Sequence, residues 1–268
     1  MAISSSACRG SLNPVHAYRW LKYKIEFRRN NPDYFDPDGL CVFAGPQGSG
    51  KTISAVNYIY NLMEAYPKCK LVTNVWLTDY PIVRFEEWFA ERGGDEDISD
   101  MEDEALFHQY VKENRVFEFL DNDDFQKYGN EDYGMIFFVD EIQLYLNSLE
   151  SKNINMEVLT QISQQRKQRK HIVATSQVFG RMAKPLREQF SCVMICDSYF
   201  GCLQRNRLLD RDGLDGDNST GTNLTGKVRK IFWWFHDPEM YNRYDTYAVI
   251  EKGKFCPGGV ERNDLYEH

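Results

Sequence analysis

The chain has 268 residues, of which 42% are hydrophobic, and its formal net charge is −8. This length and apolar content allow one α/β domain with insertions, or one domain with a small appendage, around a buried core. The negative net charge argues against a free-standing DNA-binding domain with a basic surface. The seven cysteines are an odd set without a CxxC pair, which argues against a disulfide framework or a zinc site.

The first predicted elements surround a glycine-rich turn. Residues 14–38 are predicted to form a helix followed by a turn rich in Pro, Asn and Asp. A short apolar strand at 40–45 ends in glycine, and apolar residues at helical spacing follow it as far as Pro67. A strand followed directly by such a helix is the beginning of an α/β arrangement.

Further strands alternate with helical patterns along the chain. Apolar runs predict strands at 70–77, 134–142, 171–177 and 191–198, and a helix is predicted over 157–170. Such an alternation is typical of a mostly parallel sheet flanked by helices. The predicted fold class is therefore α/β.

Two segments interrupt this pattern. Residues 84–132 combine weak helical patterns with acid and glycine, and we interpret them as an insertion on the core. The polar segment 210–226 separates two β-like runs, which predicts a long β-hairpin. The predicted organisation is an N-terminal helical segment at 1–38, a core at 39–209, and a C-terminal hairpin and tail at 210–268.

No apolar run approaches the ~20 residues that a membrane-spanning helix needs. The N-terminal residues also lack the apolar segment of a signal peptide. The sequence therefore predicts a soluble protein of the cytoplasm without a transmembrane segment of its own.

The turn after the first strand, GPQGSGKT, matches the phosphate-binding pattern GxxxxGK[ST] between a strand and a helix. Glycines let backbone N–H groups curl around phosphate oxygens, and the start of the helix adds its positive end. Lys51 is predicted to reach the β- and γ-phosphates of ATP, and the Thr52 hydroxyl to bind Mg²⁺. The predicted nucleotide-binding residues are Gly45, Pro46, Gln47, Gly48, Ser49, Gly50, Lys51 and Thr52.

The run IFFVDE ends an apolar strand with two carboxylates, Asp140 and Glu141. In open α/β sheets, ligands bind at the carboxyl edge of the strands, where these side chains should lie. Asp140 is predicted to support the Mg²⁺ ion, and Glu141 to act as the general base on the attacking water. The added glutamate favours a hydrolysing enzyme over a simple kinase.

Polar residues near the later strands complete the candidate site. Gln177 ends the strand HIVATSQ and is predicted to sense the γ-phosphate. An arginine finger acting on a neighbouring subunit could come from Arg166, Arg169 or Arg187, with Arg187 preferred. The predicted catalytic residues are Glu141, Lys51, Gln177 and Arg187, and the predicted metal ligands are Thr52 and Asp140.

Taken in order, GPQGSGKT, FFVDEI, HIVATSQ and PLREQF resemble the FtsK/HerA superfamily of DNA-pumping P-loop ATPases. Within it, the chain is most similar to zonular occludens toxin-like (Zot) phage-assembly ATPases and viral genome-packaging ATPases. The stretch YNRYDTYAVIE is similar to a Tyr-Asp-Thr segment that closes the ATPase region of Zot-like proteins. The resemblance implies a RecA-like core, ATP hydrolysis with Mg²⁺, and a homo-oligomeric ring of five or six subunits.

The function we predict is an ATP-driven motor that translocates DNA, packaging a viral genome in the host cytoplasm, with the virion as a second location. Sequence-independent DNA contacts are expected from Lys227, Arg229, Lys230 and the hairpin tip at 210–226. Capsid, portal or membrane-anchor proteins are candidate partners.

Three alternatives stay open. Filamentous-phage assembly ATPases carry a transmembrane segment after this domain, and no such segment is predicted in this sequence. An assembly or export ATPase would therefore have to work at the membrane through a partner protein. A small-molecule kinase and an ATP-binding scaffold would use the same phosphate loop. A GTPase is disfavoured because no NKxD-type motif is present.

Overall fold

The structure is a computed structural model that forms two compact units, Met1–Tyr34 and Phe35–His268. It describes residues 14–35, 39–92, 104–129, 133–146, 168–179, 182, 187–209, 227–245, 249–251 and 254–256. In the first unit, α1 (Pro14–Asn30) forms where the sequence predicts a helix, and none of its residues is buried. None of the described helices has both the length and the apolar character needed to cross a bilayer.

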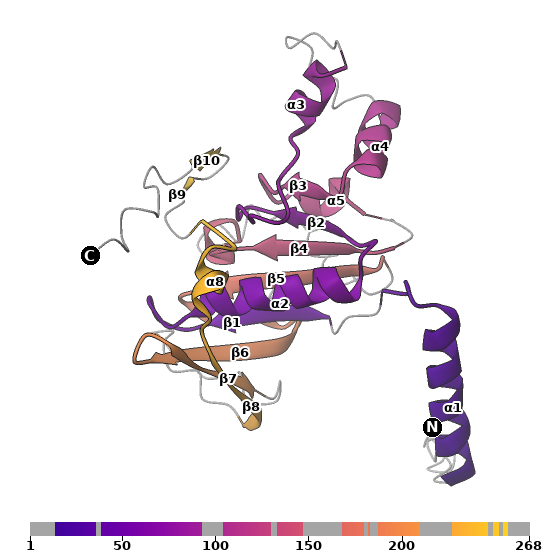
Figure 1. Ribbon diagram of the computed structural model, residues 1–268, viewed down its shortest axis with the longest axis vertical. Helices are drawn as coiled ribbons and strands as arrows, with labels where there is room; N and C mark the ends of the chain where they lie inside the picture. The colour runs from indigo at the N-terminus through magenta and orange to yellow at the C-terminus, as the bar shows by residue number, and fades with distance from the viewer. Residues whose placement is uncertain are drawn as a thin grey trace, which may run out of the picture. The chain divides into compact units, whose positions relative to one another are not determined.

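The second unit is built on an eight-stranded sheet with the order β3-β2-β4-β5-β1-β6-β7-β8 (Figure 1). The first six strands in this order pair in parallel, whereas β7 and β8 are antiparallel. The strands are β1 (Leu40–Ala44), β2 (Lys70–Thr73), β3 (Val116–Glu118), β4 (Met135–Val139), β5 (Lys170–Ser176), β6 (Phe190–Tyr199), β7 (Leu203–Leu209) and β8 (Val228–Phe235). A separate antiparallel pair contains β9 (Val249–Glu251) and β10 (Lys254–Cys256).

Helices cover both faces of this sheet, which confirms the predicted α/β class. They are α2 (Lys51–Ala65), α3 (Phe85–Ala90), α4 (Glu104–Glu113), α5 (Asp124–Lys127), η2 (Ile142–Leu144) and α8 (Pro238–Tyr241). Every residue of β1, β4 and β5 is buried, as expected of parallel strands covered on both sides. One apolar cluster includes α2, and the other includes buried residues of α3, α4 and α5.

Part of the segment 84–132, which the sequence predicts to be an insertion, belongs to the core instead. It supplies β3 at one edge of the sheet, paired in parallel with β2. Phe117 and Phe125 from this segment are fully buried with Tyr110 in an aromatic cluster. The strand was missed because it has only three residues and lies between acidic stretches. The most acidic residues, 93–103, lie outside the described part of the chain.

The predicted C-terminal hairpin is present as β7 and β8, paired from Leu203↔Phe235 to Leu209↔Val228. The first of the two β-like runs, residues 199–209, is not one strand, however. Its first residue, Tyr199, is the last residue of β6, and β7 begins at Leu203. Between them, the Cys202 N–H donates to the Tyr199 carbonyl across a turn whose central residues, Phe200 and Gly201, both have positive φ. Such a turn suits two antiparallel strands, so the hairpin extends a longer antiparallel sheet of β6, β7 and β8. The polar tip at 210–226 lies outside the described residues.

We expect Gly134→Ala to lower the free energy of unfolding by about 3 kcal/mol, because a Cβ there would overlap the buried ring of Phe35 and the backbone φ is +88°. The matched control is Gly201→Ala, at φ +72°, where no atom of the described residues lies within 4 Å of the added carbon. That variant should lose only the backbone cost of about 1 kcal/mol. Urea unfolding measures both, and equal losses would contradict the role of Phe35.

Candidate nucleotide-binding and catalytic site

The glycine-rich loop joins β1 to α2 at the carboxyl edge of the parallel strands. Gly50 caps α2 with φ +78°, in the left-handed region, and a Cβ there would collide with the Gln204 side chain. The Ser49 N–H and the Lys51 ammonium both donate to the Pro46 carbonyl, at 3.2 and 3.1 Å. The lysine is buried, although it is charged. The loop therefore curls back on itself with a cation held against its backbone.

Two features of this loop fit a chain of phosphates. Ser49 Oγ is buried and has no hydrogen-bond partner in the described part of the chain. It lies beside the buried Lys51 at the first turn of a fifteen-residue helix, whose N–H groups and dipole favour an anion. A buried hydroxyl without a partner is uncommon unless a ligand completes it. The predicted phosphate-binding residues are thus suited to that ligand.

Oxygen atoms suited to a magnesium ion meet next to this loop. The hydroxyls of Thr52 and Thr175 both donate to Asp140 Oδ1, at 3.2 and 2.5 Å. Burial, with the nearby charge of Glu141, raises the pKa of Asp140 to about 6. A cation at this position would favour the ionised carboxylate, and Mg²⁺ prefers carboxylate and hydroxyl oxygens. Thr52 and Asp140 therefore fit the metal that the sequence predicts.

Asn74, which the sequence analysis did not single out, fixes the position of Asp140. Its Oδ1 accepts from the Asp140 N–H at 2.8 Å, and its Nδ2 donates to the Asp140 carbonyl at 3.0 Å. Asn74 directly follows β2, which pairs with β4 in the sheet. In the sequence, the signal that could have identified Asn74 was its position directly after a buried strand. The strand order, which the sequence does not show, was needed to place it beside Asp140.

Glu141 lies in the left-handed region, with φ +51°, which is uncommon for a residue with a long side chain. Its N–H donates to Thr175 Oγ1 at 2.9 Å, and the same hydroxyl donates to Asp140. Its carboxylate accepts from Gln177 Nε2 at 2.8 Å and also from Gln143. The structure thus brings together the predicted base, the predicted metal ligand and the predicted sensor. A strained backbone held by several contacts is typical of functional sites.

The arginines proposed as trans-acting fingers lie elsewhere. Arg169 immediately precedes β5, and Arg187 precedes β6, whereas the phosphate loop follows β1. Because these three strands are parallel and in register, both arginines lie at the amino edge of the sheet, opposite the loop. Neither therefore reaches the site of its own chain. Arg166 is outside the described residues.

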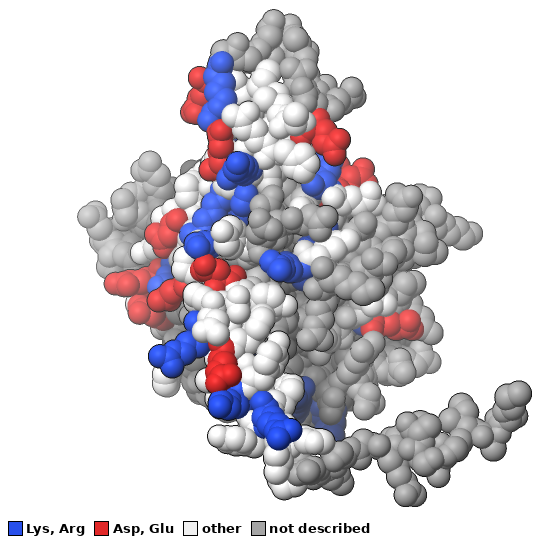
Figure 2. Space-filling view, turned by 90° about the vertical axis from the view of Figure 1, so that its right-hand side faces the viewer, with Lys and Arg blue, Asp and Glu red and all other residues white. Residues whose placement is uncertain are grey.

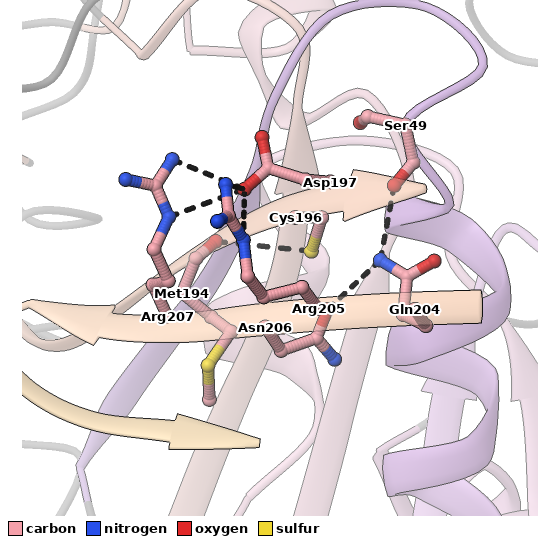
Figure 3. Close-up of polar contacts among 8 residues, drawn as sticks. All are labelled: Ser49, Met194, Cys196, Asp197, Gln204, Arg205, Asn206 and Arg207. Atoms are coloured by element: carbon pink, nitrogen blue, oxygen red, sulfur yellow. Dashed lines mark hydrogen bonds and ion pairs between the residues drawn. The ribbon is translucent and has the colours of Figure 1, made fainter. Parts of the chain in front are cut away.

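A second support of the loop, also missed in the sequence, comes from β7 (Figure 3). Gln204 is fully buried, and its Nε2 donates to the Ser49 carbonyl at 3.0 Å and to Asn206 Oδ1 at 2.9 Å. The hydroxyl of Ser54 in α2 also donates to Asn206. Figure 3 shows Asp197, Arg205 and Arg207 grouped in a separate ion-pair cluster. Gln204 and Asn206 alternate with these arginines along β7, so they lie on the face of the strand that meets the loop.

Most of the chain is similar to known proteins. The family model described as zonular occludens toxin (Zot) matches residues 39–248. No curated protein matches the chain. Among solved structures, the N-terminal domain of zonular occludens toxin from Neisseria meningitidis is similar, with 18% identity and a TM-score of 0.45, over 77% of this chain and 98% of that one.

Another similar solved structure, at lower identity, is the genome packaging NTPase B204 from Sulfolobus turreted icosahedral virus 2 in complex with AMP. It has 13% identity and a TM-score of 0.42, over 59% of this chain and 75% of that one. A third solved structure, an isolated ATPase domain, has 13% identity and a TM-score of 0.44, over 88% of this chain and 99% of that one.

Proposed function

Because this chain belongs to the zonular occludens toxin (Zot) family, we propose that it is a Mg²⁺-dependent ATPase that translocates DNA, most specifically a viral genome-packaging motor of the host cytoplasm. The observation that carries the hydrolytic part of this proposal is the Thr175 hydroxyl, which links Asp140 to Glu141 beside the phosphate loop. It supports a site in which a metal ligand and a general base are held in fixed relation. Phosphate binding alone would not need that link.

The residues of the site then divide the tasks of hydrolysis among them. The loop N–H groups and Lys51 would bind the phosphates, and Thr52 and Asp140 would hold the Mg²⁺ ion. That ion, when bound, offsets the negative charge of the phosphates. Glu141 takes a proton from the attacking water, and Gln177, bonded to Glu141, orients the base and contacts the γ-phosphate.

A ring of five or six subunits would complete the site from outside. Arg187 lies at the amino edge of the sheet, so its role as an arginine finger requires a neighbouring subunit. Arg166 and Arg169 are the alternatives. Capsid or portal proteins are proposed partners of such a ring.

The proposed DNA contacts are on β8, the strand at one edge of the sheet, and on the residue just before it. Lys227, Arg229 and Lys230 are exposed there, and the Lys230 ammonium lies 4.6 Å from the centre of the Phe232 ring. On the face shown in Figure 2, Lys and Arg side chains are interspersed with Asp and Glu over the described surface. Contacts with the DNA backbone would therefore come from local basic groups such as this one.

The test is ATP hydrolysis with and without double-stranded DNA. We expect DNA to stimulate the wild-type chain, and the triple variant Lys227→Ala, Arg229→Ala, Lys230→Ala to keep its basal rate but lose most of this stimulation. The slope of DNA affinity against salt concentration should fall by about 3, one for each lost phosphate contact. The matched control replaces the exposed Lys68, Lys112 and Lys127 by alanine. Absence of DNA stimulation in the wild type, or an equal loss in the control, would contradict the motor.

The family membership supports a second candidate function, an assembly or export ATPase that works at a membrane through a partner protein. It predicts that the chain floats with host membranes when that partner is present and stays in the soluble fraction when the partner is deleted. Flotation of lysates from infected cells, with the chain detected by antibody, separates the two roles.

A further inference from the structure

The segment 236–245, here called the strap, follows β8 and crosses over α2, as the position of α8 in Figure 1 shows. At its beginning, the His236 N–H donates to the Cys202 carbonyl at 2.7 Å. Near its end, the Arg243 carbonyl accepts from the Thr78 N–H at 2.9 Å and from the Tyr60 hydroxyl at 3.0 Å. The strap is thus attached to the β6–β7 turn, to α2 and to the loop after β2.

A cleft of about 330 Å³ lies between the strap and the phosphate loop. One side is formed by the loop and the metal ligands, including Lys51 and Asp140. The other side is formed by strap residues, including His236, Tyr241 and Asp245. Clefts of this size bind small ligands through aromatic surfaces and a few polar groups. Since the loop side suits phosphates, the strap side is left for the remainder of the nucleotide.

Hydrogen bonds fix Tyr241 relative to the phosphate loop. The Ser49 carbonyl only accepts, so Gln204 must turn its NH₂ group toward it and its Oε1 toward His236 Nε2, which lies 3.1 Å away. His236 Nε2 therefore carries the proton, which leaves Nδ1 as an acceptor 2.5 Å from the Tyr241 hydroxyl. The same hydroxyl lies 3.4 Å from the Gly201 carbonyl, so Tyr241 also contacts the β6–β7 turn. Burial lowers the pKa of His236, which agrees with a neutral ring. The aromatic wall of the cleft is thus connected to the loop that holds the phosphates.

We propose that the strap binds the nucleoside of the triphosphate, with the Tyr241 ring against a purine base and the Asp245 carboxylate accepting a hydrogen bond from the nucleoside. This rests on the proposed function, because it assumes that the phosphates lie in the loop. Every base has an apolar π-face that an aromatic side chain can stack upon. A carboxylate is a strong acceptor for ribose hydroxyls or an exocyclic amino group.

The test compares two ligands of the full-length chain, MgATP and inorganic tripolyphosphate with Mg²⁺, by calorimetry. Tripolyphosphate has the phosphates but no nucleoside. The wild type should bind ATP at least about tenfold more tightly than tripolyphosphate, as expected of a stacked base. Tyr241→Ala should weaken ATP binding by about tenfold and leave tripolyphosphate binding unchanged. Asp245→Asn should weaken ATP binding alone by several-fold.

Three further variants serve as controls. Tyr241→Phe keeps the ring and should keep most of the ATP affinity, whereas Tyr133→Ala removes a 42%-exposed tyrosine outside the cleft and should change nothing. Lys51→Ala should weaken both ligands. Unchanged tripolyphosphate binding also shows that a variant retains its folded loop.

The possible outcomes distinguish the proposed nucleoside site from the proposed function on which it rests. Equal affinity of the wild type for ATP and tripolyphosphate would overturn the nucleoside site and leave the phosphate site standing. A Tyr241→Ala variant that loses both ligands equally would show that the tyrosine acts through the loop, which also overturns the proposal. Failure of the wild type to bind either ligand would remove the proposed function itself.

Discussion

Glu141→Gln should lower the rate of ATP hydrolysis by about 10²- to 10⁴-fold, the usual contribution of a general base. Binding of MgATP should persist, because the loop, Lys51 and the pair of Thr52 and Asp140 are unchanged. The amide is close in shape to the carboxylate but cannot take a proton from water. Steady-state phosphate release measures the loss, and calorimetry with ATP measures the retained binding.

The backbone of Glu141 is held independently of its carboxylate, which makes this substitution a clean test. Its N–H is bonded to Thr175, and that bond does not involve the side chain. The Gln177 amide, now bonded to Glu141 Oε1, can turn over to meet the new amide. The matched control is Glu64→Gln, at an exposed position near the end of α2, which should hydrolyse ATP normally. Hydrolysis that survives in Glu141→Gln would mean that another group activates water.

Most of the central sheet could be predicted from the sequence because its signals are local. The strands β1 and β4 are continuous apolar runs, and β5 has an apolar centre, Ile172–Ala174. Glycine, acid or amide residues follow each strand at the edge where the site forms. The loop is a contiguous motif, so the positions of Lys51 and Thr52 followed from eight residues of sequence. Neither prediction needed knowledge of the strand order.

The contacts that were missed join residues distant in sequence. Asn74 meets Asp140 only because β2 and β4 are adjacent, and Thr175 meets both carboxylate residues only because β5 lies next to β4. Gln204 is 155 positions from Ser49. It contacts the loop because β6 and β7 extend the sheet beyond β1. Periodicity identifies which face of a strand is buried, but it does not identify the neighbouring strand.

These distant contacts suggest how the nucleotide could affect the rest of the chain. The predicted base and sensor belong to β4 and β5 on one side of the loop, whereas Gln204 and the strap lie on the other. β7 carries Gln204 and pairs directly with β8, where the proposed DNA contacts lie. A change at the loop would therefore reach the basic edge of the sheet through one pair of strands.

Gln204→Leu should lower the free energy of unfolding by about 4 kcal/mol, because it removes three hydrogen bonds at once. The leucine has a similar volume but takes the Gln204 amide away from the Ser49 carbonyl and from His236 Nε2. It also leaves Asn206 Oδ1 with the Ser54 hydroxyl as its remaining donor among the described residues. Since the Ser49 carbonyl belongs to the phosphate loop, the variant should also bind ATP and tripolyphosphate about tenfold more weakly, with each ligand affected alike. This distinguishes it from Tyr241→Ala, which should affect ATP alone.

Gln126→Leu makes the same chemical change in α5 and is the matched control. Gln126 Nε2 is buried and already has no hydrogen-bond partner among the residues described, so its loss leaves no new group unsatisfied. Urea unfolding should therefore show a change within about 0.5 kcal/mol for this variant. If Gln204→Leu changed the free energy of unfolding as little as Gln126→Leu, the hydrogen bonds of Gln204 would follow from the loop conformation and would not stabilise it. A large loss of stability with unchanged ligand binding would instead assign Gln204 to the core alone and disconnect β7 from the nucleotide.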